Sequence, residues 1–194
     1  MTDPLPKTSV RRVVAARLDD MPSAVRAAHS TVVCARVVEA ILDRRATCVM
    51  LYLAKAPELD LDEAIEALLE AGVAVAVPKV DEIGHSMQPV HLPSLDPSGM
   101  TVDRFGIRTP DAPTPFDAAS LEVVVVPGLA FDTHGGRLGR GAGFYDRFLK
   151  RLETRPFRIG TCFNAQLVTA LPTAAHDEPM DAILTEETSF FHNP

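Results

Sequence analysis

The hydrophobic positions of the chain follow two patterns, one with helical spacing and one of short unbroken runs. Residues 23–45 carry apolar side chains at near-helical spacing, which predicts an amphipathic helix. Residues 7–19 can form a shorter, basic helix. The unbroken runs predict buried strands, because a strand covered on both faces shows no polar side. The predicted strands span residues 48–54, 73–77, 122–126, 157–163 and 182–184.

A helical pattern lies between the first two of these strands, and the three segments together are typical of a parallel crossover unit. Asp60 can cap this helix at its start, and Gly72 can end it. Pro78 is expected to end the strand over residues 73–77, because proline cannot donate a ladder hydrogen bond.

Residues 81–118 are rich in Pro, Gly, Asp and Ser, which predicts loops and an edge hairpin. Short strands are expected near Met87–His91 and Arg104–Ile107, and a last helix over Gly143–Leu152. Alternating strands and helices indicate an α/β fold with a mostly parallel sheet flanked by helices on both faces. We expect one domain over residues 1–194.

The charge of the chain restricts its partners. It carries 19 basic and 26 acidic side chains, a formal net charge of −7, which does not favour nucleic-acid binding. Residues 1–17 and 137–151 are nevertheless basic, which suggests that they capture a small anion. Solvated helix faces are the alternative explanation for both clusters.

The three cysteines lie far apart in apolar surroundings and predict neither a metal site nor a disulfide framework. The N-terminal residues lack an apolar signal core, and no apolar run is long enough to span a bilayer. We therefore expect a cytoplasmic protein without a membrane partner, and we expect it to be a monomer.

One stretch, from Pro127 to Leu149, is rich enough in chemistry to suggest a site: PGLAFDTHGGRLGRGAGFYDRFL. Six of the chain's 11 glycines lie here, between a predicted strand and a predicted helix. Glycines allow backbone N–H groups to converge on an anion, and a helix N-terminus adds positive potential. Arg137 and Arg140 can bind phosphate oxygens, and Asp146 can hold Mg²⁺. The alternative is a loop that merely turns the chain, since the stretch matches neither common nucleotide-binding motif.

This stretch resembles the signature of the 5-formyltetrahydrofolate cyclo-ligases, also called 5,10-methenyltetrahydrofolate synthetases. Shorter matches to that family follow in the same order along the chain: residues 7–11, 52–53, 58–60, 77–79, 105–110 and 176–181. The resemblance implies a scaffold related to sugar-phosphate isomerases and CoA transferases. It also implies an enzyme that uses ATP and Mg²⁺ to convert 5-formyltetrahydrofolate to 5,10-methenyltetrahydrofolate, releasing ADP and phosphate.

The resemblance assigns roles to individual residues, with Arg140 as the catalytic residue. ATP would be bound by Lys7, Arg11, Arg137, Leu138, Gly139, Arg140, Gly141, Ala142, Gly143, Phe144 and Tyr145. The folate would be bound by Tyr52, Leu53, Glu58, Met87 and Tyr145, and Mg²⁺ by Asp146 and Asp181. Asp132 is expected to organise its loop, and His134 and His176 to be loop residues without a chemical role.

Two positions depart from the family pattern and leave an alternative function open. Ala142 stands where some members carry Lys, and Phe144 where Tyr is commoner. A non-catalytic relative that still binds nucleotide and folate is therefore the first alternative. The second is a different enzyme on a related α/β scaffold, such as a sugar-phosphate isomerase or CoA transferase, because fold alone does not fix function. Such an enzyme would turn over without ATP.

Overall fold

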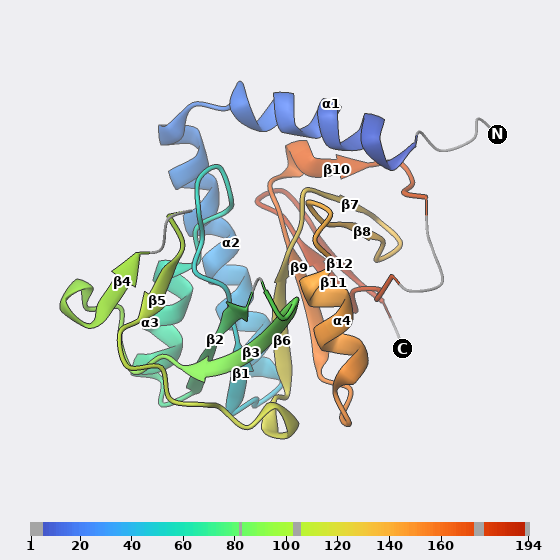
Figure 1. Cartoon of the computed structure of the whole chain (residues 1–194). Coiled ribbons are helices and arrows are strands. Elements are labelled where there is room, and N and C mark those ends of the chain that lie inside the picture. Colours follow the sequence, from blue (N-terminus) through green and yellow to red (C-terminus); the bar gives the residue numbers. More distant parts are fainter. Residues whose placement is uncertain (1–5, 82, 103–105, 173–176, 193–194) are drawn as a thin grey trace.

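The computed structural model describes residues 6–81, 83–102, 106–172 and 177–192, and its centre is a seven-stranded sheet (Figure 1). The strand order is β12-β11-β9-β6-β1-β2-β3. The five inner strands run parallel, whereas β3 and β12 pair antiparallel at the two edges. The strands are β1 (Cys48–Met50), β2 (Ala74–Asp81), β3 (Ser86–His91), β6 (Val123–Pro127), β9 (Phe157–Thr161), β11 (Ala182–Leu184) and β12 (Ser189–Phe191).

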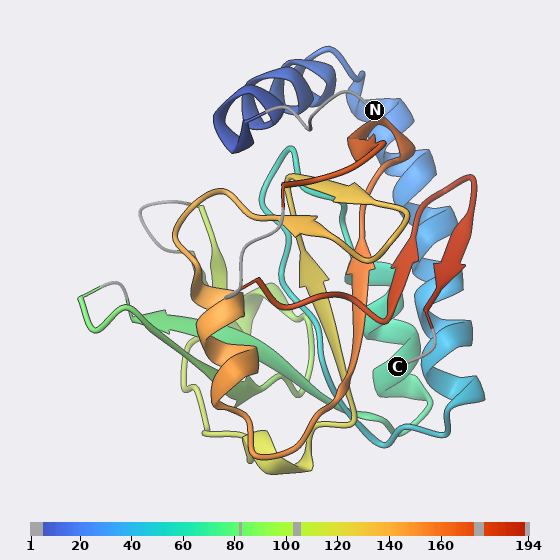
Figure 2. The ribbon, with the colours of Figure 1, turned by 90° about the vertical axis from the view of Figure 1, so that its right-hand side faces the viewer.

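Helices cover both faces of this sheet, as the sequence predicted. Alternate strand residues point to opposite faces, so Val123 and Val125 join one hydrophobic cluster and Val124 and Val126 the other. The first face packs against α2 (Ser23–Asp43) and α3 (Asp62–Glu70), and the second against α4 (Phe144–Arg151). Figure 2 shows α2 and α3 on the side of the sheet away from α4. The buried side chains are mainly aliphatic, as the composition predicted.

The N-terminal helix α1 (Lys7–Asp19) lies across the ends of the other elements rather than along the sheet (Figure 1). Its apolar face is narrow: Val10, Val14 and Leu18 are buried, and these positions recur every four residues on one side of a helix. The same helix carries Lys7 and Arg11 near its start; Arg11 reaches the loop before α4, and Lys7 reaches Asp177. The packing of three buried residues therefore fixes where two cations are placed.

A small three-stranded sheet at the carboxyl end of the main sheet was not predicted. β7 (Ala130–Asp132), β8 (Arg137–Leu138) and β10 (Leu167–Val168) form a small sheet of their own, and β4 (Met100–Val102) pairs with β5 (Arg108–Pro110). Strands of two or three residues are too short to show a period of two. Asp132 organises the β7–β8 turn as expected, because its carboxylate accepts the N–H groups of His134 and Gly136 at 3.0 and 2.8 Å.

The prediction that Pro78 ends its strand was wrong, because β2 continues through Pro78 to Asp81. Pro78 lies opposite Pro89 in the antiparallel β2–β3 pair. Residues in such a pair alternate between hydrogen-bonded and non-hydrogen-bonded positions, and a position of the second kind needs no N–H. The Pro89 carbonyl indeed points away from β2 and accepts the Phe116 N–H at 3.0 Å. Two facing prolines are therefore compatible with a continuous strand.

Other boundaries also differ from the predictions. Helix α3 has Leu61, not Asp60, at its N-cap, although the Asp60 carboxylate still accepts the N–H of Asp62. Helix α2 ends at Asp43, and β1 at Met50. In the predicted strand Arg104–Ile107, residues 104 and 105 lie outside the described residues, and the strand begins at Arg108 instead. His176 also lies outside them. None of the described helices is long and apolar enough to cross a membrane.

Candidate functional site

The glycine-rich loop lies between β8 and α4, at the carboxyl edge of the parallel strands. Ligand sites of open α/β sheets lie at this edge. Gly141 and Gly143 have φ angles of +119° and +69°, a region that side-chain-bearing residues rarely adopt. Gly143 is the N-cap of α4, so the loop delivers its backbone to the positive end of that helix.

A polar hollow of about 450 Å³ lies on one side of this loop, and we call it the charged hollow. The loop residues Gly139 to Gly143, Arg140 excepted, form one wall, and α1 and α4 supply others. Its ionisable side chains are five cations and two carboxylates: Lys7, Arg11, Arg137, Arg147, Lys150, Asp146 and Asp177. On a chain with a net charge of −7, such an excess of cations favours a strongly anionic ligand.

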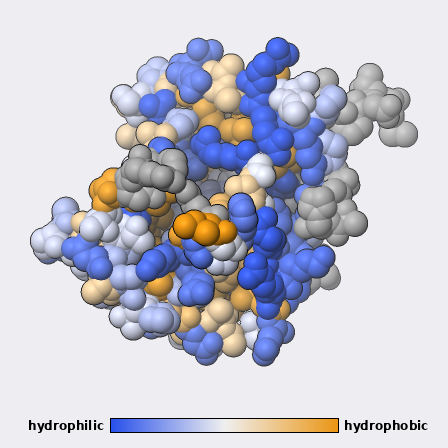
Figure 3. Space-filling model, in the orientation of Figure 1, coloured by the Kyte–Doolittle hydropathy of each residue, from blue (hydrophilic) through white to orange (hydrophobic). Residues whose placement is uncertain are grey.

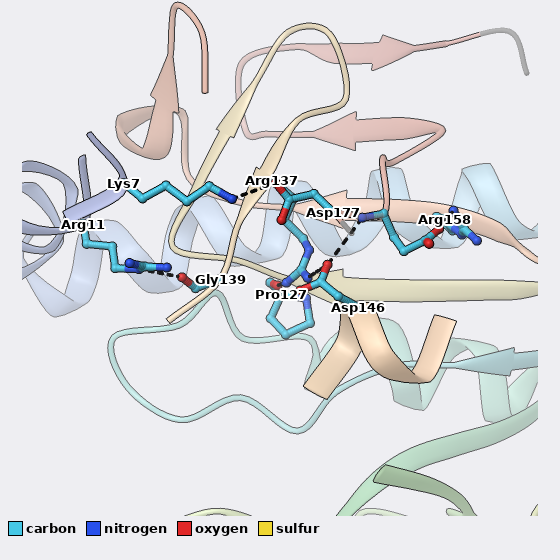
Figure 4. A network of polar contacts seen from close by, with 9 residues as sticks. Lys7, Arg11, Pro127, Arg137, Gly139, Asp146, Arg158 and Asp177 are labelled. Atoms are coloured by element: carbon cyan, nitrogen blue, oxygen red, sulfur yellow. Dashed lines mark hydrogen bonds and ion pairs between the residues drawn. The ribbon is translucent and has the colours of Figure 1, made fainter. Parts of the chain in front are cut away.

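Helix α1 is attached to the charged hollow by two polar contacts. The Lys7 ammonium lies 2.7 Å from the Asp177 carboxylate, and Arg11 Nε donates to the Gly139 carbonyl at 3.0 Å. Figure 4 shows Lys7 reaching from α1 toward Asp177 and Arg11 reaching toward Gly139. Neither cation is buried, so each can exchange its present partner for an incoming anion at little cost.

The deepest charge at the site is the guanidinium of Arg137, whose side chain is only 5% exposed. It donates to the Asp146 carboxylate at 2.7 Å and to the Pro127 carbonyl at 3.2 Å (Figure 4). Its Nε is buried and has no partner among the described residues. A buried pair of this kind holds both side chains in one arrangement, because separating them would leave a desolvated charge.

A second hollow of about 390 Å³ lies on the other side of the loop, and we call it the apolar hollow. Its walls are mostly apolar and aromatic, and include Tyr52, Leu53, Pro78, Met87, Ile107, Phe144 and Tyr145. Five residues line both hollows: Arg137, Gly139, Ala142, Gly143 and Asp146. In Figure 3, hydrophilic side chains gather over α4, and apolar side chains lie at the centre of the same face. The loop is thus a shared wall between two unlike spaces.

Glu58 and Arg140 face each other in the apolar hollow, with Arg140 Nε 3.3 Å from Glu58 Oε1. The other Glu58 oxygen accepts the N–H of Lys55 at 3.2 Å. Arg140 is 55% exposed, and Glu58 is its one acceptor among the described residues. The guanidinium therefore keeps free donors that a bound molecule can use.

Two tyrosine hydroxyls in the apolar hollow differ in their partners. Tyr52 Oη donates to the Leu59 carbonyl at 3.1 Å and lies 3.0 Å from Thr161 Oγ1. Tyr145 Oη is buried and has no partner among the described residues. Burial raises the pKa of both phenols well above the ordinary value, so both stay neutral at physiological pH. A buried hydroxyl without a partner is costly, and a ligand can satisfy it.

Comparison with known proteins places this geometry in a family. Residues 5–186 match the model of the 5-formyltetrahydrofolate cyclo-ligase family. The chain belongs to this family. It is 34% identical over 145 residues to the 5-formyltetrahydrofolate cyclo-ligase of Escherichia coli, with 71% of this chain and 76% of the relative covered. It is 29% identical over 186 residues to that of Mycolicibacterium smegmatis, with 94% of each covered.

The fold of the cyclo-ligase family is also the fold of this chain. The NMR structure of the Aquifex aeolicus 5,10-methenyltetrahydrofolate synthetase superimposes with a TM-score of 0.81 at 28% identity, covering 96% of this chain and 93% of that one. The family resemblance, the α/β class and the assignment as an enzyme are confirmed. The wider relationship to sugar-phosphate isomerases and CoA transferases stays a prediction.

Most residues that the sequence assigned to ATP line the charged hollow, and every residue that it assigned to the folate alone lines the apolar hollow. Arg140 and the first residues of α4, which were assigned to ATP, line the apolar hollow instead. Eight of the residues assigned to ATP line the charged hollow: Lys7, Arg11, Arg137, Leu138, Gly139, Gly141, Ala142 and Gly143. Arg140, Phe144 and Tyr145 line the apolar hollow together with Tyr52, Leu53, Glu58 and Met87.

Asp181 is the one assigned residue that the structure does not bring to the two hollows. Its carboxylate is 5% exposed, lies 2.6 Å from the Arg155 guanidinium and accepts the Arg158 N–H at 2.9 Å. It lines neither hollow. The carboxylate that accompanies Asp146 in the charged hollow is Asp177, four residues earlier. The structure therefore places Asp177, rather than Asp181, beside Asp146 in the charged hollow.

Three other cations of the site received no role from the sequence. Arg147 and Lys150 line the charged hollow, and Lys55 lines the apolar hollow. The first two belong to the basic cluster over residues 137–151. Lys150 lies four residues after Asp146 and three after Arg147 on α4, and helical geometry places residues at these spacings on one side. Lys55 lies in the loop after β1, and the sequence of an irregular loop does not predict where a side chain points.

Proposed function

We propose that this cyclo-ligase converts 5-formyltetrahydrofolate to 5,10-methenyltetrahydrofolate, with cleavage of ATP to ADP and phosphate. The observation that carries the proposal is the pair of hollows on either side of one glycine-rich loop. One hollow suits a polyanion and the other a flat, largely apolar molecule. A reaction that transfers a phosphoryl group from one substrate to the other needs both spaces to meet.

The charged hollow supports the nucleotide half of the proposal. Its five cations and the glycine backbone offer many donors for phosphate oxygens. Lys7 and Arg11 would exchange Asp177 and the Gly139 carbonyl for phosphate oxygens. Lys150 lies in the last turn of α4 and adds a further positive charge. Because α1 carries two of these cations, nucleotide binding would also fasten α1 to the site.

Mg²⁺ fits the same hollow through Asp146 and Asp177. No group of three or more metal-ligating side chains exists among the described residues, but Mg²⁺ beside nucleotides needs only one or two carboxylates and the phosphates themselves. Asp146 and Asp177 line the wall of the charged hollow, and each is now neutralised by a cation. Bound there, the ion would offset negative charge on the phosphates. Asp181 does not fit, since Arg155 and Arg158 occupy its oxygens.

The apolar hollow supports the folate half. Met87 and Phe144 offer apolar surfaces against which a pterin ring can pack. Glu58 can accept hydrogen bonds from the donor-rich edge of the pterin, and Tyr145 Oη is a buried donor without a partner among the described residues. Phe144 keeps the ring face that a tyrosine would offer there, so its departure from the family pattern leaves this packing intact.

The reaction proceeds in two displacements. The formyl oxygen attacks the γ-phosphorus, ADP leaves, and the formyl carbon becomes bonded to a phosphorylated oxygen. Nitrogen 10 then attacks that carbon, its proton is lost, and phosphate departs as the five-membered ring closes. Arg140 lies on the apolar side of the shared wall with free donors, where charge on the transferring phosphoryl group would develop. The wall itself aligns the two substrates.

The test is the appearance of methenyl absorbance when purified protein is mixed with 5-formyltetrahydrofolate and Mg-ATP. We expect wild-type turnover that requires ATP, and loss of most of the rate in Arg140→Ala, by roughly 10²-fold or more. Arg12→Ala is the matched control, because Arg12 is exposed on α1 and lines neither hollow. Near-normal turnover in Arg140→Ala would contradict the assignment.

Two other outcomes would favour the alternatives. Binding of both substrates without turnover would indicate a non-catalytic relative, for which Ala142 is the feature in favour. Turnover of a sugar phosphate or a CoA ester without ATP would indicate another enzyme class on this scaffold. We further propose that the chain is one domain, acts in the cytoplasm and is a monomer, which sedimentation at 21.0 kDa would support.

A further inference from the structure

The guanidinium of Arg147 lies where three parts of the cyclo-ligase site meet. Its Nε donates to the His85 carbonyl, in the turn of the β2–β3 hairpin, at 3.2 Å. Its Nη1 is 2.8 Å from the point where a Cβ of Gly143 would lie, so the guanidinium rests against the glycine-rich loop. Its central carbon is 5.2 Å from the centre of the Phe144 ring, which lines the apolar hollow. Arg147 itself lines the charged hollow.

Most donors of this guanidinium have no partner among the described residues. A guanidinium carries five N–H groups, and the His85 carbonyl is the one described acceptor for Arg147. Its Nη2 is buried, and no described residue accepts a hydrogen bond from it. The two carboxylates of the charged hollow are already paired with Lys7 and Arg137. Arg147 therefore keeps a positive charge and several donors for an anion in that hollow.

The hairpin that Arg147 contacts is a wall of the apolar hollow. Val80 of β2 and Met87 of β3 line that hollow, and His85 lies in the turn between the two strands. Figures 1 and 2 show this hairpin beside α4. Ile83 of the same turn is 96% exposed, so its side chain does not anchor the turn. The hydrogen bond from Arg147 thus joins one wall of the apolar hollow to a cation of the charged hollow.

We propose that Arg147 couples the two hollows, so that nucleotide in the charged hollow strengthens the binding of folate in the apolar hollow. The inference rests on the proposed function, which assigns one substrate to each hollow. A guanidinium is planar and rigid, so it can donate to a phosphate oxygen through Nη while its Nε keeps the His85 carbonyl. The phosphate then fixes the guanidinium, and the guanidinium fixes the hairpin turn. The pterin meets a wall that is already ordered, and less conformational entropy is lost when it binds.

The expected coupling is moderate, because a single hydrogen bond carries it to the hairpin. Coupling between two sites typically changes affinity by about 5–150-fold, and one bond favours the low end of that range. We expect Mg-ADP to lower the Kd for 5-formyltetrahydrofolate about fivefold. Because linkage is reciprocal, 5-formyltetrahydrofolate must lower the Kd for Mg-ADP by the same factor.

Titration calorimetry with Mg-ADP, which supports no turnover, measures this coupling. Arg147→Met keeps the apolar stem but no donor, so its Kd for 5-formyltetrahydrofolate should be the same with and without Mg-ADP. Arg147→Lys keeps the charge and should bind Mg-ADP within about threefold of wild type, but one ammonium does not span the phosphate and the His85 carbonyl, so the coupling is lost again. Arg151→Met is the matched control, because Arg151 is exposed on α4 and lines neither hollow. A wild-type Kd that Mg-ADP leaves unchanged, or a fivefold effect that persists in either Arg147 variant, would overturn the proposal.

Hydrogen exchange follows the hairpin itself. With folate absent, Mg-ADP should slow the exchange of backbone amides in residues 83–87 of wild type and of Arg151→Met. The same amides should exchange at an unchanged rate in both Arg147 variants. A purely structural role of Arg147 would instead change the exchange rate equally with and without nucleotide, and that result would count against the coupling.

The coupling and the proposed function can fail separately. If wild type never forms methenyl product, yet Mg-ADP and 5-formyltetrahydrofolate strengthen each other's binding through Arg147, the coupling stands and the proposed reaction fails. If wild type turns over and the two compounds bind independently, the reaction stands and the coupling fails.

Discussion

The charged and apolar hollows share five residues and differ in nearly everything else. The charged hollow gathers five cations from α1, the loop and α4, whereas the apolar hollow gathers rings and aliphatic chains from the loop after β1, the β2–β3 hairpin and the start of α4. A polyanion would lose most of its hydrogen bonds in the second space, and a pterin would find little packing in the first.

The glycine-rich loop separates the two hollows and presents a different side to each of them. Neighbouring residues of this short segment line different hollows. Arg140 lines only the apolar hollow and Gly141 only the charged one, whereas both hollows are lined by Gly139, Ala142 and Gly143. With positive φ at Gly141 and Gly143, the loop can turn its backbone to one side and the Arg140 side chain to the other. The loop can thereby hold phosphates with N–H groups while Arg140 reaches around to the second substrate.

The largest expected effect separates two aspartates that the sequence treated alike. Asp146→Asn removes the negative charge at the shared wall and should lower the rate of methenyl formation roughly 10²–10³-fold. Asp181→Asn should leave the rate within about threefold and lower the free energy of unfolding by ~1–3 kcal/mol, since it weakens the contacts with Arg155 and Arg158. Urea titration and the absorbance assay measure both. The reverse pattern would return Asp181 to the site.

A smaller effect is expected for Lys7→Met, which tests whether the nucleotide binds in the charged hollow alone. Lys7→Met removes one phosphate partner, so KM for ATP should rise about tenfold while KM for the folate stays unchanged. Arg12→Met, on the exposed side of α1, should change neither. Equal increases of both KM values in Lys7→Met would mean that the two hollows do not divide the substrates.

Substitutions of Tyr52 and Tyr145 test whether the two hydroxyls differ in their hydrogen-bond partners within the protein. Tyr52→Phe loses the bonds to Leu59 and Thr161 and should lower the free energy of unfolding by ~1–2 kcal/mol. Tyr145→Phe removes a hydroxyl that has no described partner and should change stability by less than ~0.5 kcal/mol, yet it should weaken folate binding. Denaturant titration of the free proteins gives the comparison. Equal destabilisation would show that Tyr145 is satisfied within the protein.

The smallest effect appears at alkaline pH. Because burial raises the pKa of Tyr52 and Tyr145 above 10.0, their contribution to stability is complete below pH 10 and decreases as the pH rises toward the folded values. Each tyrosine adds up to ~1.4 kcal/mol per pH unit to that decrease. Tyr145→Phe should therefore make the curve of unfolding free energy against pH shallower by less than this amount between pH 10 and 10.5. An unchanged slope would mean that Tyr145 ionises freely in the folded protein.

Long elements were predictable because their patterns repeat. The spacing of apolar residues in α1 and α2 covers several turns, and the valines of β6 leave no polar face. The small strands β7, β8 and β10 are too short for any period. The prediction for Pro78 was wrong because a proline ends a strand only at a position where the partner strand needs a backbone N–H. Whether a position is of that kind depends on the pairing with the partner strand, which the sequence does not show.

The sequence predicted which loop forms the candidate site, but it predicted only part of the spatial arrangement of the residues around that loop. Glycine spacing identified the segment, and the resemblance assigned its substrates, but a motif does not say to which side each residue turns. Asp177 and Asp181 are four residues apart and chemically identical, so only the position of Arg155 and Lys7 tells them apart.

The account depends on the division of two substrates between two spaces, and a crystal structure with Mg-ADP and 5-formyltetrahydrofolate bound tests it most directly. We predict phosphates among Lys7, Arg11 and the glycine backbone, and the pterin against Met87 and Phe144 with its formyl group facing the loop. Phosphates seated among Met87 and Tyr52, or a pterin bound beside Lys150, would contradict it.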